Sequence, residues 1–312
     1  MNFATQLDRY LIIRRSLGYD LSTGERILRR FARFADDKNA SHMSTDLFLR
    51  WMASMPSVSG GTRTARLTAV RIFAQWLSGI DPEHEVPPSG LLPHRINRSR
   101  PYIYSEAEID AIIAAARELP SVYGVRGLTC STLFGLISVT GLRISEALAL
   151  DRHDLDRQKA VLRVRKGKLG KERALPLDPS VVDHLSDYLI ERDRLIGEAV
   201  SPLFVIEEGT RLTDCSARYS FARICQDIGL REPQRRLRHG RGPRIHDLRH
   251  TFAVRTMIGW YKAGKDPNRE MIRLTTYLGH TKPSATYWYL EAVPELMELA
   301  LKQASCSGEM GS

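Results

Sequence analysis

Apolar side chains recur at helical spacing through the first eighty residues of the chain. Leu7, Tyr10 and Leu11 are three and four residues apart, and a helix places such positions on one face. Breaks in the pattern fall at Gly18, at residues 36–44 and at residues 56–61. We therefore predict a domain of four short helices over residues 1–81.

The periodic pattern is absent between residues 82 and 104, and four prolines lie close together over residues 82–93. Proline lacks a backbone N–H and fixes its own φ angle, so a run of prolines without apolar periodicity is typical of a linker. Basic side chains in such a segment can follow a DNA backbone between two domains, and the candidates are Arg95, Arg98 and Arg100. We predict a basic linker over residues 82–104.

Helical periodicity resumes at residue 105. Ser105 and Glu108 have the spacing of a capping box, in which each side chain bonds the backbone N–H of the other residue. Residues 128–139 are apolar on nearly every side, which predicts a buried central helix that ends at Gly141. Residues 105–312 form the second predicted domain.

Two stretches of this second domain have the character of strands. Residues 160–165 alternate apolar and basic side chains, residues 172–177 read as a second extended stretch, and a Lys-rich and Gly-rich turn at 166–171 joins them into a hairpin. The remaining expected elements are helices over 179–195 and 214–228 and a short strand over 203–206. The fold class is mainly α, with a four-helix domain followed by a helix-rich domain that contains a small antiparallel β-sheet.

Positive charge is concentrated near the N-terminus. The 312 residues carry a formal net charge of +10, and 15 basic against 9 acidic residues in the first hundred supply most of it. Such an excess favours a polyanionic partner through counterion release. Arg63 and Arg66 lie at a predicted helix start among threonines, a pattern suited to DNA phosphates, although basic helical faces are more often only solvated.

The cysteines and the N-terminus indicate a protein of the cytoplasm. The four cysteines show neither C-x-x-C spacing nor the paired framework of a secreted scaffold. The chain begins without a signal-peptide pattern, and no run approaches the roughly 20 apolar residues of a membrane span. We expect a cytoplasmic, nucleoid-associated protein without membrane contact.

Candidate chemistry lies between residues 244 and 289. His246, Arg249 and His250 are spaced i, i+3 and i+4, so on a helix they project from one face. A guanidinium beside imidazoles at a helix start favours a phosphate or carboxylate ligand, whereas the plainer interpretation is a solvated basic face. His280 follows Gly279 at an expected helix end, and Tyr289 lies nine residues later in an aromatic cluster.

A zinc site is the competing interpretation, because His246 and His250 have the spacing of a zinc-protease helix. Asp247 stands between them in place of the usual glutamate, no third ligand follows at a suitable spacing, and Arg249 disfavours a cation. No Asp or Glu cluster is suited to magnesium either, so we expect no metal and no cofactor. Residues 231–244 form a basic loop whose use is phosphate contact, with candidates Arg236, Arg241 and Arg244.

These motifs resemble those of the tyrosine recombinases, the family of phage integrases, Xer-type resolvases and transposon integrases. The family signature is Arg, Lys, His-x-x-Arg, His and Tyr in that order, with the last His in Leu-Gly-His and the Tyr nine residues beyond. The matching residues are Arg143, a lysine of the turn 166–171, His246, Arg249, His280 and Tyr289. The resemblance is strong over residues 105–295 and loose over the first hundred.

The resemblance implies a role for each matching residue. Arg143 and Arg249 would bind the non-bridging phosphate oxygens with His246 and His280 as further donors, and Tyr289 would be the nucleophile. Lys168, with Lys166 as the alternative alignment, would protonate the leaving 5′ oxygen. Supporting roles fall to Glu146, which would orient Arg143, and to His250, which would buttress the site.

The implied activity is site-specific recombination of double-stranded DNA. It would proceed through a 3′-phosphotyrosyl intermediate and a Holliday junction, on a homotetramer acting alone or with sister recombinases, in the service of a mobile element. The first domain would be the core-binding part of a C-shaped clamp around DNA. The alternatives left open are a type IB topoisomerase-like relaxing enzyme and a non-catalytic DNA-binding relative. An apolar helix over residues 294–301 would either pack on its own domain or exchange into a neighbouring subunit.

Overall fold

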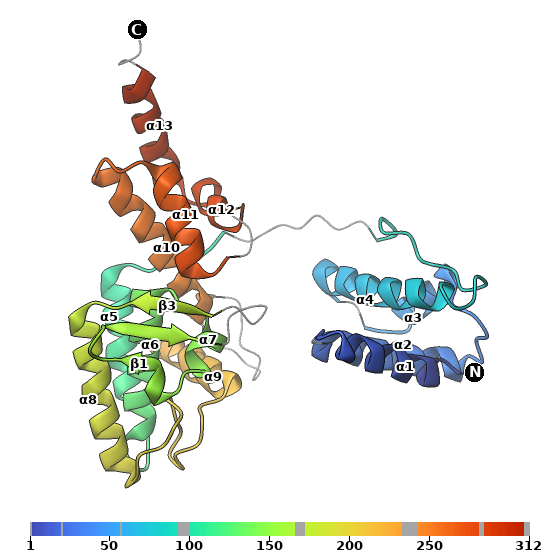
Figure 1. Cartoon of the computed structure of the whole chain (residues 1–312), viewed down its shortest axis with the longest axis horizontal. Coiled ribbons are helices and arrows are strands. Elements are labelled where there is room, and N and C mark those ends of the chain that lie inside the picture. The colour runs from blue at the N-terminus through green and yellow to red at the C-terminus, as the bar shows by residue number, and fades with distance from the viewer. Residues whose placement is uncertain are drawn as a thin grey trace. The chain divides into compact units, whose positions relative to one another are not determined.

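The computed structural model describes residues 2–19, 21–56, 58–92, 100–165, 172–232, 242–280 and 284–308. The chain divides into two compact units, Met1–Ser99 and Arg100–Ser312 (Figure 1). The turn at 166–171 and most of the basic loop after residue 232 lie outside the described residues.

The first unit contains the four predicted helices, α1 (Phe3–Ser16), α2 (Ser22–Asp37), α3 (Thr45–Ala53) and α4 (Gly60–Ser78). Side-chain oxygens start three of them by accepting a backbone N–H of the first turn, those of Asn2, Ser44 and Ser59. Phe3, Phe31 and Trp51 are at most 2% exposed and meet edge to face in the core. The prediction of a mainly helical first domain is confirmed.

The structure differs from the predicted linker at both of its ends. Val86, Leu91 and Leu92 pack against the core of the first unit, and buried His84 accepts a hydrogen bond from the backbone N–H of Met43 at 2.9 Å. Tyr104 is buried in the core of the second unit. Pattern analysis missed these contacts because the apolar residues of the segment have no regular period.

The second unit is built around α6 (Val125–Thr140), which is buried along most of its length as predicted. It packs against α5 (Glu106–Arg117), α8 (Pro179–Ile196) and α10 (Ile245–Lys262). The capping box of Ser105 and Glu108 begins α5 as expected. The left-handed φ of +63° at Gly141, where α6 ends, is one that glycine adopts readily.

A three-stranded antiparallel sheet lies on this helical core, in the order β1-β2-β3. The predicted hairpin consists of β2 (Val161–Val164) and β3 (Arg173–Pro176), paired so that Val164 lies opposite Arg173. β1 (Leu155–Asp156) was not predicted, because two residues carry no readable alternation. The predicted strand at 203–206 is wrong, since Pro202 and Val205 form only isolated bridges.

The other elements of the second unit are α7 (Ile144–Leu148), a 3-10 turn (Arg152–Asp154), α9 (Asp214–Asp227), α11 (Pro267–Leu278), α12 (Ser284–Ala292) and α13 (Pro294–Gly308). α13 packs against α10 and α12 and extends beyond them in Figure 1. A second apolar cluster joins these C-terminal helices and contains Val254, Met257, Leu274, Tyr289 and Leu296. No helix of the described ranges is long and apolar enough to cross a membrane.

Candidate active site

Arg143 enters the site because the chain turns sharply after α6. Gly141 ends α6, and Arg143 caps the start of α7 two residues later. A Cβ at Gly141 would lie 2.5 Å from Phe252, so the turn also needs the small residue for close packing on α10. The Arg143 guanidinium reaches Glu146 one helical turn onward, with 2.7 Å from NH1 to Oε1.

Glu146 is a buried carboxylate held by two arginines. It accepts hydrogen bonds from the Arg143 backbone N–H at 3.1 Å and from Arg173 NH1 and NH2 at 3.1 and 2.8 Å. Burial alone would raise the pKa of Glu146, but the bonds from Arg173 and Arg143 outweigh it and lower the pKa to about 2. Glu146 is therefore an anion throughout the physiological range.

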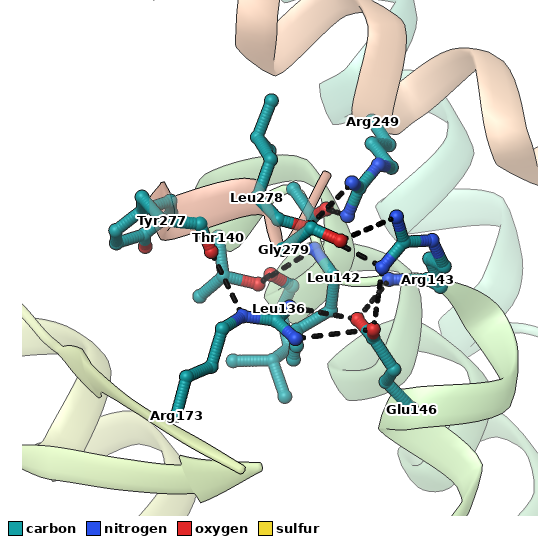
Figure 2. Close-up of polar contacts among 11 residues, drawn as sticks. Leu136, Thr140, Leu142, Arg143, Glu146, Arg173, Arg249, Tyr277, Leu278 and Gly279 are labelled. Atoms are coloured by element: carbon teal, nitrogen blue, oxygen red, sulfur yellow. Dashed lines mark hydrogen bonds and ion pairs between the residues drawn. The ribbon is translucent and has the colours of Figure 1, made fainter. Parts of the chain in front are cut away.

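Arg143 and Arg249 converge on the last carbonyls of α11, as Figure 2 shows. Arg249 is 1% exposed and donates to the carbonyl oxygens of Leu278 at 2.7 Å and Gly141 at 2.6 Å. Arg143 donates to those of Leu278 at 3.3 Å and Gly279 at 3.1 Å. The C-terminal end of a helix supplies carbonyls without intrahelical partners and a partial negative charge, so it favours the two cations that gather there.

Three histidines surround these arginines. The rings of His246 and His250, on one face of α10, lie 4.6 Å apart edge to face. His280 Nδ1 lies 2.7 Å from the Thr286 hydroxyl. Burial, and then neighbouring positive or imidazole groups, lower the pKa of His250 and of His280 to about 3. The same causes lower the pKa of His246 to about 4 although part of its side chain is exposed, so all three are neutral near pH 7.

Tyr289 is 2% exposed, and its hydroxyl lies 2.8 Å from His250 Nδ1. Its ring contacts those of His250 and Trp288. Tyr287, the other tyrosine of α12, is 40% exposed. Of the two candidate nucleophiles, Tyr289 is the one that contacts a histidine of the α10 face.

The structure therefore brings together five residues singled out in the sequence. Arg143 and Arg249 both donate to the Leu278 carbonyl, and Arg143 also binds the carbonyl of Gly279, the residue before His280. The His246 ring contacts that of His250, and His250 contacts the Tyr289 hydroxyl. Lys168 and Lys166 lie outside the described residues. Their hairpin is anchored beside the group through Arg173 of β3.

The candidate DNA contacts have different surroundings. Arg63, Arg100 and Arg244 are exposed, whereas Arg66 is half-buried with its guanidinium 5.8 Å from the centre of the Trp51 ring. The other four candidates, Arg95, Arg98, Arg236 and Arg241, lie outside the described residues.

Arg173 is the residue that sequence reasoning missed. Its side chain is 13% exposed, bonds both oxygens of Glu146, and donates from Nε to the Tyr277 carbonyl at 2.8 Å. In the sequence it is one basic residue of the extended stretch 172–177. The one available signal was its place on a strand that leads from a lysine-rich turn into the core.

The structure also describes the residues of the competing metal interpretations. Asp247 is buried and accepts the backbone N–H of Arg244 at 2.8 Å, so it caps α10. One group of three potential metal ligands does occur in the described ranges, unlike the sequence expectation, and comprises Asp151, His153 and Asp154. Arg165 and Arg211 already donate to its two carboxylates.

Comparison with known proteins identifies the family of the chain. The model of the phage integrase family matches residues 103–295. A putative integrase/recombinase of Sinorhizobium fredii, y4rB, is 41% identical over 307 residues and covers 96% of each chain. The tyrosine recombinase XerC of Rhodospirillum centenum is 29% identical over 250 residues, which are 80% of this chain and 67% of the relative.

Solved structures share the fold at lower identity. The Tn1549 transposon integrase in complex with transposon right-end DNA aligns with a TM-score of 0.65 and 15% identity over 98% of this chain and 100% of its own. The XerH site-specific recombinase bound to its difH substrate aligns with a TM-score of 0.62 and 20% identity over 90% and 78% of the two chains. With the family match and the 41% identical relative, these findings lead to one conclusion: the chain belongs to the phage integrase family and is a tyrosine site-specific recombinase.

Proposed function

We propose that this recombinase cleaves and rejoins DNA with Tyr289 as nucleophile and Arg143, Arg249, His246 and His280 around the scissile phosphate. The observation that carries the assignment is the convergence of Arg143 and Arg249 on the carbonyl oxygens of Leu278 and Gly279. A guanidinium–phosphate bond joins opposite full charges and can be two-pointed, whereas a carbonyl oxygen offers only a partial negative charge. A phosphate oxygen can therefore replace a carbonyl as partner of these guanidinium groups.

The covalent step follows from the surroundings of Tyr289. Its oxygen attacks phosphorus, the bond to the 5′ oxygen breaks, and the strand is held as a 3′-phosphotyrosyl ester. The phenol proton passes to His250 Nδ1, 2.8 Å away, in the tautomer that leaves this nitrogen unprotonated. A phosphate anion beside the site favours the charged form of His250 and so raises its pKa. Lys168 of the hairpin turn protonates the departing 5′ oxygen.

The proposed substrate is double-stranded DNA with a specific recombination site, of the kind used by mobile elements. Support comes from the relatives called integrase/recombinase and from the transposon integrase whose fold this chain shares. The exposed Arg63, Arg100 and Arg244, with the arginines of the predicted linker and of the basic loop, would contact the phosphates. We place the protein at the nucleoid on the same grounds.

The proposed assembly is a homotetramer on DNA joined by α13, with recombination proceeding through a Holliday junction. Leu296 at the start of α13 is buried in its own unit, whereas Met297 is 43% and Leu301 62% exposed. Leu299 and Ala300 are half-buried, so the home domain covers the described part of this apolar helix only partly. The exposed apolar surface of Met297 and Leu301 is area that a groove on a neighbouring subunit would bury, as in the helix-in-groove mode of recognition.

A nicked suicide substrate tests the nucleophile, because the cleaved end diffuses away and traps the covalent complex. We expect a denaturant-resistant adduct with the wild-type protein and with Tyr287→Phe, the matched control from the same helix. Tyr289→Phe should bind the DNA but form no adduct. An adduct that persists in Tyr289→Phe contradicts the assignment.

The same preparations separate recombination from simple relaxation. A recombinase should exchange strands between two DNA molecules that carry the site and should leave supercoiled plasmids without a site unrelaxed. Relaxation of such plasmids without strand exchange would instead support the type IB topoisomerase alternative.

A further inference from the structure

Arg173 holds together three parts of the site that are far apart in the sequence. It lies on β3, it bonds Glu146 in the first turn of α7 with two nitrogens, and its Nε donates to the Tyr277 carbonyl near the end of α11. Figure 2 shows that Arg173 and Arg143 approach the Glu146 carboxylate from different directions. The hairpin, the α7 start and the turn that leads to His280 therefore meet at one side chain.

Each oxygen of Glu146 divides its hydrogen bonds between the two arginines. Oε1 accepts from Arg143 NH1 at 2.7 Å and from Arg173 NH1 at 3.1 Å. Oε2 accepts from the Arg143 backbone N–H at 3.1 Å and from Arg173 NH2 at 2.8 Å. The two-point guanidinium–carboxylate pair is thus made by Arg173, and the Arg143 guanidinium has a single bond to this carboxylate.

Because of this division, Arg143 Nη2 does not bind Glu146. It donates instead to the Gly279 carbonyl at 3.1 Å, in the same turn that Arg249 contacts through the Leu278 carbonyl. Without Arg173, each oxygen of this buried carboxylate would lose one of its two donors. A buried anion must be paired, and Arg143 is the guanidinium within reach.

The net charge of the cluster also predicts that loss of Arg173 weakens the interaction of the site with the scissile phosphate. Arg143, Arg173 and Arg249 surround the single carboxylate of Glu146, so the cluster has an excess of positive charge. Removal of Arg173 takes away one of these charges and lets Glu146 neutralise Arg143. The site would then attract the scissile phosphate less strongly at the point where charge develops during cleavage.

We propose that Arg173 is a positioning residue for DNA cleavage: by binding both oxygens of Glu146, it prevents a two-point pair between Glu146 and Arg143 and keeps Arg143 available to the scissile phosphate. The proposal rests on the function proposed above. It assigns to Arg173 an effect on the cleavage rate, exerted through Glu146, rather than a contact with DNA.

The test compares single-turnover cleavage of the nicked substrate by wild-type protein, Arg173→Gln, Glu146→Gln and the double variant. Arg173→Gln should cleave at least about 30-fold more slowly, a somewhat smaller loss than the roughly 100- to 1000-fold found when a donor that contacts the developing charge is removed. DNA affinity should stay within about threefold, because the many other phosphate contacts remain. The double variant should cleave at least about fivefold faster than Arg173→Gln, because an amide no longer captures Arg143.

The matched control is Arg194→Gln. Arg194 also makes a two-nitrogen pair with a glutamate, Glu191, but on the exposed surface of α8, where such pairs contribute little. Its cleavage rate should equal that of the wild type. Arg173→Lys, which keeps the charge but cannot form the two-point pair, is the second variant if Arg173→Gln fails to fold. It should lose at least about fivefold in rate with unchanged DNA affinity.

The outcomes are separable. A double variant no faster than Arg173→Gln, or Arg173→Lys cleaving at the wild-type rate, overturns the positioning role while the proposed function stands. Wild-type protein that forms no adduct refutes the proposed function and this inference together. Recovery of cleavage in the double variant supports action through Glu146 when Arg173→Gln and the double variant unfold thermally at the same temperature, because the recovery then does not come from restored folding.

Discussion

Replacing Met297 and Leu301 together by alanine tests the proposed exchange of α13. Alanine preserves the helix, so the substitution removes apolar surface without changing the backbone preference. Full burial of such a side chain contributes about 1.5–3 kcal/mol. The two side chains are 43% and 62% exposed in the isolated chain, so a partner groove can still gain about 2–3 kcal/mol per subunit from covering them.

That energy corresponds to about 30- to 150-fold in the association constant of each contact. We expect the double variant to bind a single recombination site normally and to form the synaptic complex on native gels only at correspondingly higher protein concentration. Ile190→Ala is the matched control, because Ile190 is 65% exposed on α8 and lies outside the C-terminal helices. It should assemble like the wild type.

Leu296→Ala should behave differently from the double variant. Leu296 is fully buried in the cluster that includes Tyr289, so its truncation should destabilise the folded chain by about 2–4 kcal/mol. Thermal unfolding measures this loss in the absence of DNA. Synaptic complexes that form at the wild-type concentration in Met297→Ala/Leu301→Ala would refute the exchange of α13 and favour a helix that serves only its own subunit.

The remaining predictions concern acid, backbone and metal. His250 and His280 have a lower pKa in the folded chain than the ordinary value of 6.5. At mildly acidic pH they are therefore protonated in the unfolded chain and neutral in the folded chain. Folding stability should therefore fall as pH drops below about 6.5, by about 1–2 kcal/mol per histidine at pH 5, and thermal unfolding of the DNA-free protein at pH 5 and pH 7.5 measures it. Gly141→Ala should destabilise by at least about 1 kcal/mol in the same assay, because its φ is +63° and the new Cβ would meet Phe252 at 2.5 Å. Excess EDTA should leave adduct formation unchanged, since guanidinium groups rather than a metal neutralise the phosphate in the proposed mechanism; a requirement for Mg²⁺ would contradict it.

Local signals account for most of the fold that sequence reasoning predicted. The breaks after residues 16, 37 and 53 coincide with turn residues, and the Ser105 capping box fixes the first helix of the second unit. The apolar run of residues 128–139 can only be a buried element, and its length favours a helix. The contacts of Val86 and Leu91 with the first core could not be predicted, because these residues have no regular period and are placed by tertiary packing.

The site was readable from sequence to the extent that its residues carry recognisable spacing. His246, Arg249 and His250 lie on one helix, so their proximity follows from helical geometry alone. Arg173 has no such spacing, because Glu146 and Tyr277 lie 27 and 104 residues away and reach it only in the folded domain. The chain has 46 Lys and Arg residues, and the sequence alone does not distinguish Arg173 from the others until its hydrogen-bond acceptors are known.

The carbonyl partners of Arg143 and Arg249 bear on how mutational scans of this protein should be interpreted. Leu278 and Gly279 hold the two guanidinium groups with main-chain oxygens, which every substitution at these positions retains. Alanine scanning would therefore detect the loss of the arginine side chains but would leave these carbonyl acceptors in place. Gly279 is the exception, since its φ of +66° and its closeness to Arg173 make any side chain there move the backbone that carries them. A loss of activity on substitution of this glycine would therefore report on the positions of the carbonyl acceptors. These positions are set by the backbone conformation and not by the chemistry of any one side chain.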